Sequence, residues 1–307
     1  MKPIKLKPAL KDYLWGGTRL KTEFGLESEL DKIAEAWVLS CHSDGPSVAT
    51  EGEFAGEPLA EIAQKLGTDC LGTRGAEFPF FPILIKLIDA KSPLSIQVHP
   101  SDEYALENEN QFGKSEMWYI VDCDPGAELF YGFSREISAD EFASRIENDT
   151  LIEVLNRVPV KKGDCFFIDA GTIHAIGEGI LIAEIQQNSN CTYRVYDYGR
   201  VGADGKPREL HVEKAKKVTK TCPPEYAFGK PESDILASCK YFTVTRHNIA
   251  GEKEISVGSE SFAAYLCTVG EVMVDGVSLR AGECAFVPAY YGKLVLSGNG
   301  EVLESRV

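Results

Sequence analysis

The chain has 307 residues, of which 44% are hydrophobic and 26% are charged, as in ordinary soluble globular proteins. It carries 47 acidic and 32 basic residues, so its formal net charge of −15 makes nucleic acids and anionic membranes poor partners. The longest apolar stretch, around Phe78 to Ile88, contains two prolines and a lysine, so no segment is expected to span a bilayer.

The N-terminal segment and the cysteines favour a cytoplasmic location. Residues 1–10 include two prolines and lack the apolar core of a secretory signal. The nine cysteines show no Cys-x-x-Cys pairing and lie singly within apolar stretches such as 164–166 and 283–285, which fits a reducing compartment. We interpret the cysteines as small buried hydrophobic residues. The protein is expected to be a monomer or a weak homodimer.

In chain order, the sequence predicts a mainly β protein with a few short helices. Pro58 opens and Gly67 closes a segment whose apolar residues recur at helical spacing, which predicts a first short helix. Two capping-box patterns predict further short helices over 139–148 and 151–157. A two-residue turn with a hairpin signal lies at 274–277. Strands are predicted at 81–87, 117–121, 165–168, 180–185, 193–196 and over most of 241–307.

An internal repeat indicates two related barrels. Residues 163–170 resemble residues 282–289, which lie 119 positions later, and each copy has a glycine turn followed by a short apolar strand. Such a unit is typical of small β-barrels. Two jelly-roll barrels are therefore expected.

The two barrels are expected to differ in function. The first copy is followed by His174, whereas Lys293 stands at the equivalent place in the second copy, so only the first has a metal-type ligand there. We predict an N-terminal metal-binding domain over 1–222 and a C-terminal barrel without metal ligands over 235–307. A proline-rich linker separates them.

Four side chains form a candidate metal site. Gln97 and His99 lie on one face of a predicted strand because strand side chains alternate with period two. Glu116 stands where a later strand begins, and His174 follows the strand at 165–168. Two imidazoles, one carboxylate and one amide oxygen would make a mononuclear site with open positions. The other histidines lack such partners: we expect His42 and His211 to be structural and His247 to be an exposed strand residue.

These residues fall in the cupin pattern, and together with further motifs they resemble type I mannose-6-phosphate isomerases of the short bacterial form. The second cupin motif departs from the usual pattern, with Asp169 where proline is common. The resemblance covers nearly the whole chain and is carried by residues 15–17, 97–100, 113–119, 163–174 and 187–197. It implies two cupin barrels and one zinc ion per chain, bound by Gln97, His99, Glu116 and His174.

The same resemblance implies a sugar-phosphate substrate and places Arg194, Lys86, Lys114 and Glu184 in the active site. The implied reaction interconverts mannose 6-phosphate and fructose 6-phosphate. It moves a proton between C1 and C2 of the sugar through an enediolate intermediate. Arg194 would stabilise the developing oxyanion. Glu184 is the first candidate for the catalytic base and Lys114 the second, while Lys86 suits the phosphate or a sugar hydroxyl.

One departure from the family pattern leaves alternatives open. The family usually has aspartate at the position of Asn190, and an amide cannot take up a proton at neutral pH. A sugar-phosphate-sensing cupin without turnover is therefore one alternative. Two histidines and a carboxylate also describe a mononuclear metal oxygenase, although the nearby lysines and arginines suit an anionic polyol better.

Overall fold

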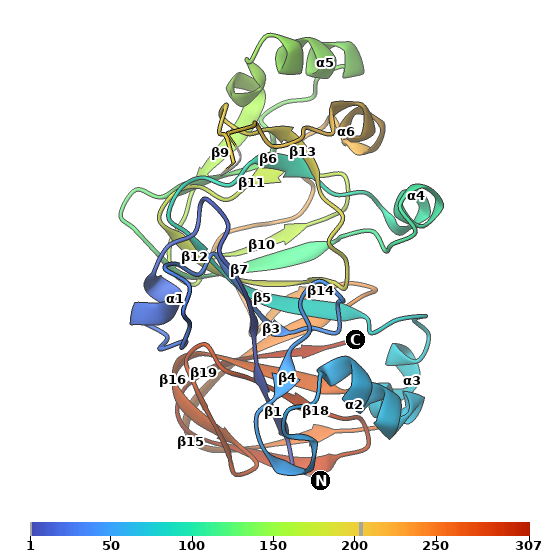
Figure 1. Cartoon of the computed structure of the whole chain (residues 1–307), viewed down its shortest axis with the longest axis vertical. Coiled ribbons are helices and arrows are strands. Elements are labelled where there is room, and N and C mark those ends of the chain that lie inside the picture. The colour runs from blue at the N-terminus through green and yellow to red at the C-terminus, as the bar shows by residue number, and fades with distance from the viewer. Residues whose placement is uncertain (1, 203–204) are drawn as a thin grey trace.

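Three antiparallel sheets follow one another along the long axis of the molecule (Figure 1). The computed structural model describes residues 2–202 and 205–307. Its strands are β1 (Ile4–Lys7), β2 (Ala9–Lys11), β3 (Glu35–Leu39), β4 (Val48–Ala49), β5 (Ile83–Ala90), β6 (Ile96–Val98), β7 (Glu116–Cys123), β8 (Glu128–Phe133), β9 (Leu155–Pro159), β10 (Cys165–Ile168), β11 (His174–Ala175), β12 (Ile180–Gln187), β13 (Tyr193–Tyr196), β14 (Ile235–Ser238), β15 (Thr243–Val257), β16 (Ala263–Val274), β17 (Val277–Arg280), β18 (Cys284–Val287) and β19 (Gly292–Arg306).

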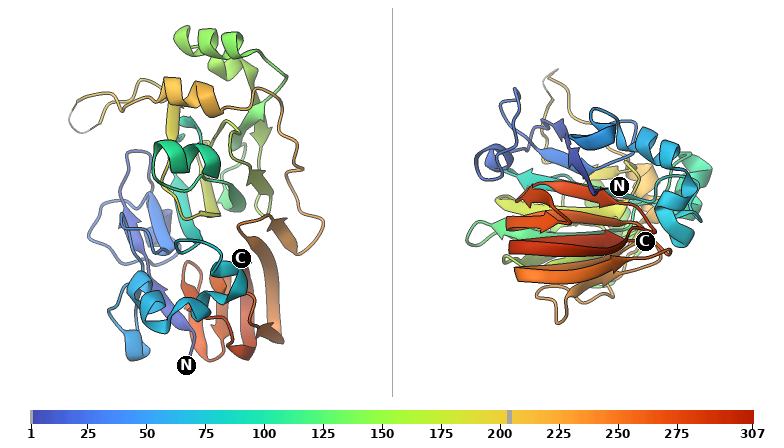
Figure 2. Two further views of the ribbon diagram at one scale, coloured as in Figure 1. Left: turned by 90° about the vertical axis from the view of Figure 1, so that its right-hand side faces the viewer. Right: turned by 90° about the horizontal axis from the view of Figure 1, so that it is seen from below.

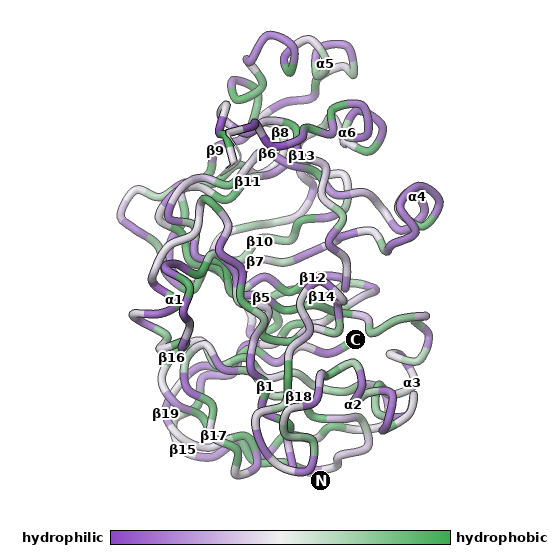
Figure 3. The backbone as a smooth tube through the Cα atoms, viewed as in Figure 1, coloured by the Kyte–Doolittle hydropathy of each residue, from purple (hydrophilic) through white to green (hydrophobic). Residues whose placement is uncertain are grey.

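The helices are short and lie outside the sheets. The α-helices are α1 (Arg19–Thr22), α2 (Leu59–Leu66), α3 (Gly72–Gly75), α4 (Asp102–Asn108), α5 (Ala139–Glu147) and α6 (Val212–Val218), and the 3-10 helices are η1 (Gly52–Phe54), η2 (Thr68–Leu71) and η3 (Leu151–Val154). Figure 3 shows α4 as largely hydrophilic. Within the described residues, no helix is long and apolar enough to cross a membrane. The predicted mainly β class is confirmed.

The three sheets are built from different parts of the chain. The six-stranded sheet has the order β10-β7-β12-β5-β3-β2, and the five-stranded sheet has the order β13-β6-β11-β8-β9. The eight-stranded sheet is built mostly from the C-terminal strands, in the order β14-β15-β19-β16-β18-β1-β4 with β17 on β16. The view from below in Figure 2 shows its C-terminal strands side by side. The N-terminal strand β1 thus joins the C-terminal sheet.

Strand β5 shows how the layers pack. All eight of its residues are buried, because both faces of the six-stranded sheet are covered. Ile85 and Leu87 share a core with Phe286 of the eight-stranded sheet, whereas Ile88 belongs to a second core with Tyr131 of the five-stranded sheet. Since successive side chains alternate, Lys86 lies on the same face as Ile88, between the six-stranded and five-stranded sheets.

The repeated turn and the hairpin form as predicted. Strands β10 and β18 occupy equivalent places in the two copies, and Gly163 and Gly282 precede them with φ of 88° and 91°. This left-handed conformation favours glycine, which explains why the residue recurs. Between β16 and β17, Asp275 and Gly276 also have positive φ, as a two-residue hairpin turn requires.

The predicted helices are confirmed in two of three places. Helices α2 and α5 lie where expected, and the Ser138 side chain accepts a hydrogen bond from the backbone N–H of Glu141. The prediction of a helix over 151–157 is wrong beyond Val154. A 3-10 helix, η3, ends at that residue, and strand β9 begins at Leu155. Leu155 pairs with β8, so sheet pairing overrides the local capping signal there.

The prediction of an exposed His247 is also wrong. Its ring is buried, and Nε2 lies 2.6 Å from Oε2 of Glu304, while Nδ1 lies 2.9 Å from Nζ of Lys253. Glu304 also accepts a hydrogen bond from Tyr265 and pairs with Arg306. A polar ring can be buried at this place because a carboxylate on the neighbouring strand satisfies it.

The cysteines are free throughout the described chain. Most are buried or half-buried, as expected for small hydrophobic residues, but Cys222 is exposed.

The Glu304 cluster gives a testable stability effect. Burial alone would raise the pKa of the Glu304 carboxyl, but the His247 ring and the Arg306 guanidinium hold that pKa below its usual value. A carboxyl of this kind stabilises the fold above its unfolded-state pKa, and the contribution is lost as the pH falls through the lower folded-state pKa. We expect Glu304→Gln to lower the free energy of unfolding by about 3 kcal/mol at pH 7. The difference should shrink below about pH 4 in urea unfolding.

The matched control is Glu254→Gln, which removes an exposed ion pair with Lys293 on the same pair of strands and should change stability little. A Glu304→Gln effect that stays constant from pH 7 to pH 3 would contradict this account.

Candidate active site

A row of four side chains crosses the inner face of the six-stranded sheet. Trp37 on β3 pairs with Lys86 on β5, Lys86 pairs with Glu184 on β12, and Glu184 pairs with Trp118 on β7. Residues paired directly across antiparallel strands point to the same face and lie in contact. The sheet register therefore places a lysine and a glutamate side by side between two tryptophans.

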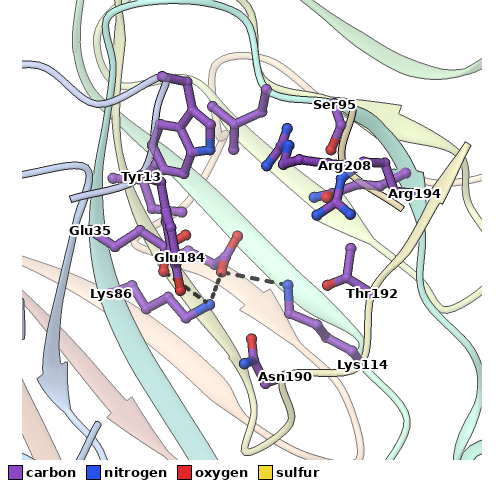
Figure 4. A pocket seen from close by; sticks show the side chains of 14 residues that line it. Tyr13, Glu35, Lys86, Ser95, Lys114, Glu184, Asn190, Thr192, Arg194 and Arg208 are labelled. Carbon is purple, nitrogen blue, oxygen red and sulfur yellow. Dashed lines mark ion pairs between the residues drawn. The ribbon is translucent and has the colours of Figure 1, made fainter. Parts of the chain in front are cut away.

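The charges in this row are linked. Lys86 Nζ lies 3.3 Å from Oε1 of Glu184 and 3.7 Å from Oε2 of Glu35, and Lys114 Nζ lies 3.6 Å from the same Glu184 oxygen (Figure 4). Each carboxylate accepts an indole N–H, Glu35 from Trp37 at 2.6 Å and Glu184 from Trp118 at 3.0 Å. Burial alone would lower the pKa of Lys86, but Glu35 and Glu184 raise it above its usual value.

A buried cluster of two histidines and one glutamate adjoins this row. His99, Glu116 and His174 offer ligand atoms that all lie within 4.8 Å of one another. Glu116 has no exposed surface, and the Nε2 atoms of both histidines lie 3.5 Å from its two oxygens. Among the residues that the structure describes, neither oxygen has a well-aligned hydrogen bond, although the Lys114 ammonium forms an ion pair with Oε2. A buried carboxylate facing two imidazoles is the donor set of a divalent metal site.

Backbone carbonyls orient the two histidine rings. His99 Nδ1 lies 3.0 Å from the Cys191 carbonyl oxygen, and His174 Nδ1 lies 2.8 Å from that of Thr172. A carbonyl can only accept, so each Nδ1 carries the proton and each Nε2 has a free lone pair, to which Lys114 Nζ donates in His99 at 3.1 Å. Such hydrogen bonds to carbonyls are the usual way in which proteins fix metal-binding histidines.

The protonation states suit metal binding near neutral pH. Burial, helped by the neighbouring Lys114 ammonium, lowers the pKa of His99 to about 4, and burial also lowers the pKa of His174. Burial alone would raise the pKa of Glu116, but Lys114 and then His99 hold that pKa well below its usual value. Lys114 Nζ lies 2.5 Å from Glu116. The histidines are therefore neutral and the glutamate is ionised.

Gln97 lies between this cluster and the arginines. It pairs with His174 on β11 on one side and with Arg194 on β13 on the other. Its amide nitrogen is 3.4 Å from His174 Nε2. The side chain lines a cavity of about 260 Å³, into which Lys86, Lys114, Glu184 and Arg194 also project. The structure thus brings together all the site residues that the sequence predicted.

The cavity has two ends of different charge (Figure 4). Lys86, Glu184 and Lys114 lie on one side, and Arg194 and Arg208 lie on the other. Arg208 and Arg200 both pair with Asp197, whereas Arg194 has no ion pair among the residues that the structure describes. Within residues 2–202 and 205–307, the Arg194 side chain donates to the Glu209 carbonyl alone, and its Nε is buried without a partner. Its charge is available to an anion in the cavity.

Two family models match the chain. The model of the phosphomannose isomerase type I catalytic domain matches residues 4–122, and that of the mannose-6-phosphate isomerase cupin domain matches residues 232–307. Mannose-6-phosphate isomerase ManA of Bacillus subtilis is 37% identical over 320 residues, which cover 99% of each chain. The chain belongs to the type I phosphomannose isomerase family.

Other relatives agree with this membership. Mannose-6-phosphate isomerase of Streptococcus mutans is 35% identical over 317 residues, covering 99% of this chain and 98% of that one. The crystal structure of a mannose 6-phosphate isomerase from Bacillus subtilis matches with a TM-score of 0.89 at 34% identity over the whole of both chains. The resemblance inferred from the sequence motifs and the expected cupin fold are both confirmed.

Several cavity residues of this phosphomannose isomerase family member were not singled out from the sequence. They are Tyr13, Glu35, Ser95, Thr192 and Arg208. Glu35 stands two residues before a tryptophan on a buried strand, and that alternation is a signal that could have found it. Arg208 has no comparable signal, because only the folded loop brings it to Asp197.

Asn190, where the family usually has aspartate, lies at the rim of the cavity. Its Nδ2 donates a 2.9 Å hydrogen bond to Oδ2 of Asp44, in the loop after β3. An aspartate at this position would place two carboxylates in contact. The Asp44 carboxylate therefore favours an amide at position 190, because an amide can donate a hydrogen bond to it and a second carboxylate would repel it.

The metal cluster gives a direct prediction. Because removing one ligand of a site with two histidines greatly weakens binding, we expect His99→Ala, Glu116→Ala and His174→Ala each to lose the divalent metal that the wild type binds. Metal content after dialysis, measured by inductively coupled plasma mass spectrometry, tests this. His42→Ala is the control, since His42 lies outside the cluster, and it should keep its metal. Full metal content in His174→Ala would contradict the cluster's role.

Proposed function

We propose that the protein interconverts mannose 6-phosphate and fructose 6-phosphate through an enediolate, using the cavity between the six-stranded and five-stranded sheets. The observation that carries the proposal is the buried His99, Glu116 and His174 cluster beside a cavity that also holds Glu184 and Arg194. Membership of the type I phosphomannose isomerase family supports it.

We propose one Zn²⁺ ion per chain, bound by Gln97, His99, Glu116 and His174. The neutral Nε2 atoms and the buried Glu116 carboxylate fit such an ion. A solved mannose 6-phosphate isomerase of the same fold, with a TM-score of 0.80 at 20% identity, is bound with zinc and yttrium. Zinc held by these residues would supply a Lewis acid for the O1 and O2 oxygens of the sugar.

The charge distribution of the cavity favours one orientation of the substrate. Arg208 lies at the cationic end of the cavity and suits the phosphate, whereas Arg194, which pairs with Gln97 across the sheet, is left for the oxyanion. Lys86 lies between Glu35 and Glu184, and two carboxylates would repel a phosphate there. Lys86 and Glu35 therefore suit sugar hydroxyls.

We propose that Glu184 moves the proton. In the forward direction its carboxylate takes the proton from C2, so the C–H bond breaks and the electron pair enters the enediolate. It then returns the proton to C1, while the hydroxyl proton passes from O2 to O1, and no other reactant is consumed. Glu184 Oε1 is flanked by the ammonium groups of Lys86 at 3.3 Å and Lys114 at 3.6 Å, which favour its ionised, proton-accepting form. Lys114 is the second candidate for this role.

Lys114 has two carboxylate neighbours. Its ammonium lies 2.5 Å from Glu116 and 3.6 Å from Glu184. A divalent cation at Glu116 would compensate the charge that Lys114 now compensates, so the lysine can turn to Glu184 and to the substrate.

We also propose the division into a metal-binding domain over 1–222 and a C-terminal barrel over 235–307, because the whole cluster lies within 1–222 and Lys293 in the C-terminal sheet is exposed. Strands β1 and β4 of the first segment complete the sheet of the second. A cytoplasmic monomer or weak homodimer remains our proposal for the state of the protein in the cell.

The experiment that tests the function is a coupled assay of mannose 6-phosphate conversion to fructose 6-phosphate. Activity should disappear after chelation and return with zinc. Zinc-loaded protein that binds mannose 6-phosphate without turnover would instead favour the sensing alternative.

Arg194 should act in the transition state. We expect Arg194→Ala to keep its metal and its fold but to lose kcat by about two to three orders of magnitude, as when an oxyanion donor is removed. Steady-state kinetics measure this, and Arg208→Ala is the matched comparison, since it should mainly raise KM. A change of Arg194→Ala confined to KM would show that Arg194 only binds substrate.

Asn190 should not be a catalytic acid or base. We expect Asn190→Asp to change the rate by no more than about tenfold, the scale of one modest hydrogen-bond change. The new carboxylate loses the hydrogen bond to Asp44, so Asp44→Asn in the same chain should restore most of any loss. A gain of several hundredfold in Asn190→Asp would show that aspartate is the missing catalytic group.

A further inference from the structure

Glu35 is a cavity residue with an unusually fixed carboxylate. The side chain is 11% exposed, and its Oε2 accepts the Trp37 indole N–H at 2.6 Å. The same oxygen lies 3.7 Å from Lys86 Nζ. The indole N–H therefore holds the Glu35 carboxylate beside Lys86.

The Lys86 ammonium depends on the Glu35 carboxylate because the lysine side chain is buried. Its ammonium has two carboxylates within ion-pair distance, Glu35 and Glu184, and it lies 5.0 Å from the centre of the Trp37 ring. A buried ammonium without a counter-charge is strongly disfavoured. When Glu184 takes up a proton, Glu35 is the remaining carboxylate in contact with Lys86.

We propose that Glu35 is a positioning residue that keeps Lys86 charged and in place while Glu184 takes up and returns the substrate proton. This role rests on the proposed isomerase function. It explains why Lys86 is bordered by a carboxylate on each neighbouring strand, β3 and β12, when one alone would neutralise it. Lys86 then keeps its hydrogen bonds to the sugar throughout the reaction.

The electrostatic surroundings of Lys86 agree with this role. Burial acts to lower the pKa of Lys86, and the Glu35 carboxylate is the largest influence that raises it, ahead of Glu184 and Glu116. The other charged or titratable groups nearby include Tyr13, whose pKa is raised to about 12 by burial and then by Glu35, and Lys11, which lies over the Trp37 ring. They also include Lys114, which shares Glu184, and His42, whose pKa is lowered by burial and by Lys86 among others. Removing the Glu35 charge should therefore lower the pKa of Lys86.

Glu35→Gln tests the proposal, because the amide oxygen can still accept the Trp37 indole N–H while the charge is lost. We expect metal content and thermal stability close to wild type, kcat at least about tenfold lower, and KM changed by less than about threefold. The alkaline limb of the kcat–pH profile should move to lower pH. In a Lys86→Met background, Glu35→Gln should have no further effect on kcat.

Glu35→Asp keeps the charge and is the matched control, and its alkaline limb should stay near that of wild type. It also keeps the proposal testable if Glu35→Gln does not fold, since an Asp variant with a shifted alkaline limb would contradict it. If the wild type is active and Glu35→Gln changes neither kcat nor its pH profile, the role of Glu35 is refuted and the proposed function stands. Failure of the wild type to isomerise mannose 6-phosphate would refute the proposed function and this role with it.

Discussion

The burial of the Glu116 carboxylate is the constraint on which the site depends. An ionised group with no exposed surface is strongly disfavoured unless opposite charge and hydrogen-bond donors surround it. In this structure the charge comes from Lys114, and two imidazoles present lone pairs toward the same oxygens. Lone pairs that face a carboxylate repel it unless a cation lies among them, and here the Lys114 ammonium lies 2.5 Å from Glu116 and 3.1 Å from His99 Nε2. A divalent metal ion bound by the same groups would take over that role, and Lys114 would then be the side chain that moves.

The sheet register extends this constraint across the cavity. Glu116 begins β7, and Trp118, two residues later, donates to Glu184 on the next strand. Glu184 in turn pairs with Lys86, and Lys86 pairs with Trp37 beside Glu35. Cations and carboxylates thus alternate across the sheet, and each is compensated by its neighbour. This explains how a chain with a formal net charge of −15 can offer cationic groups to an anionic sugar.

Much of this could be predicted from the sequence, because local patterns carry it. The glycine turns before β10 and β18, the hairpin at 274–277 and the caps of α2 and α5 depend on neighbouring residues and were predicted. The histidines and Glu116 were found because metal ligands belong to a small set of residue types in motifs with a known order. Glu184 and Arg194 line the cavity that adjoins this cluster, although those two positions came from family resemblance.

The rest depends on contacts between distant parts of the chain. His247 is buried because Glu304 lies beside it, 57 residues later, and no local pattern signals that partner. Residues 155–159 form a strand because β8 is available for pairing, despite a helix-capping signal before them. Arg208 reaches the cavity only through Asp197, and the partnership of Asn190 with Asp44 spans 146 positions. Such pairings are set by sheet order and loop packing.

The most direct measurement is a crystal structure of the zinc-loaded protein with anomalous diffraction data collected at the zinc edge. The account predicts one strong anomalous peak per chain within bonding distance of a Glu116 oxygen, the Nε2 atoms of His99 and His174, and the Gln97 side chain, at about 2.0–2.2 Å for the oxygen and nitrogen ligands. Lys114 should have left Glu116 and turned toward Glu184. A peak elsewhere in the molecule, or a Lys114 ammonium still paired with Glu116 in the loaded protein, would contradict it.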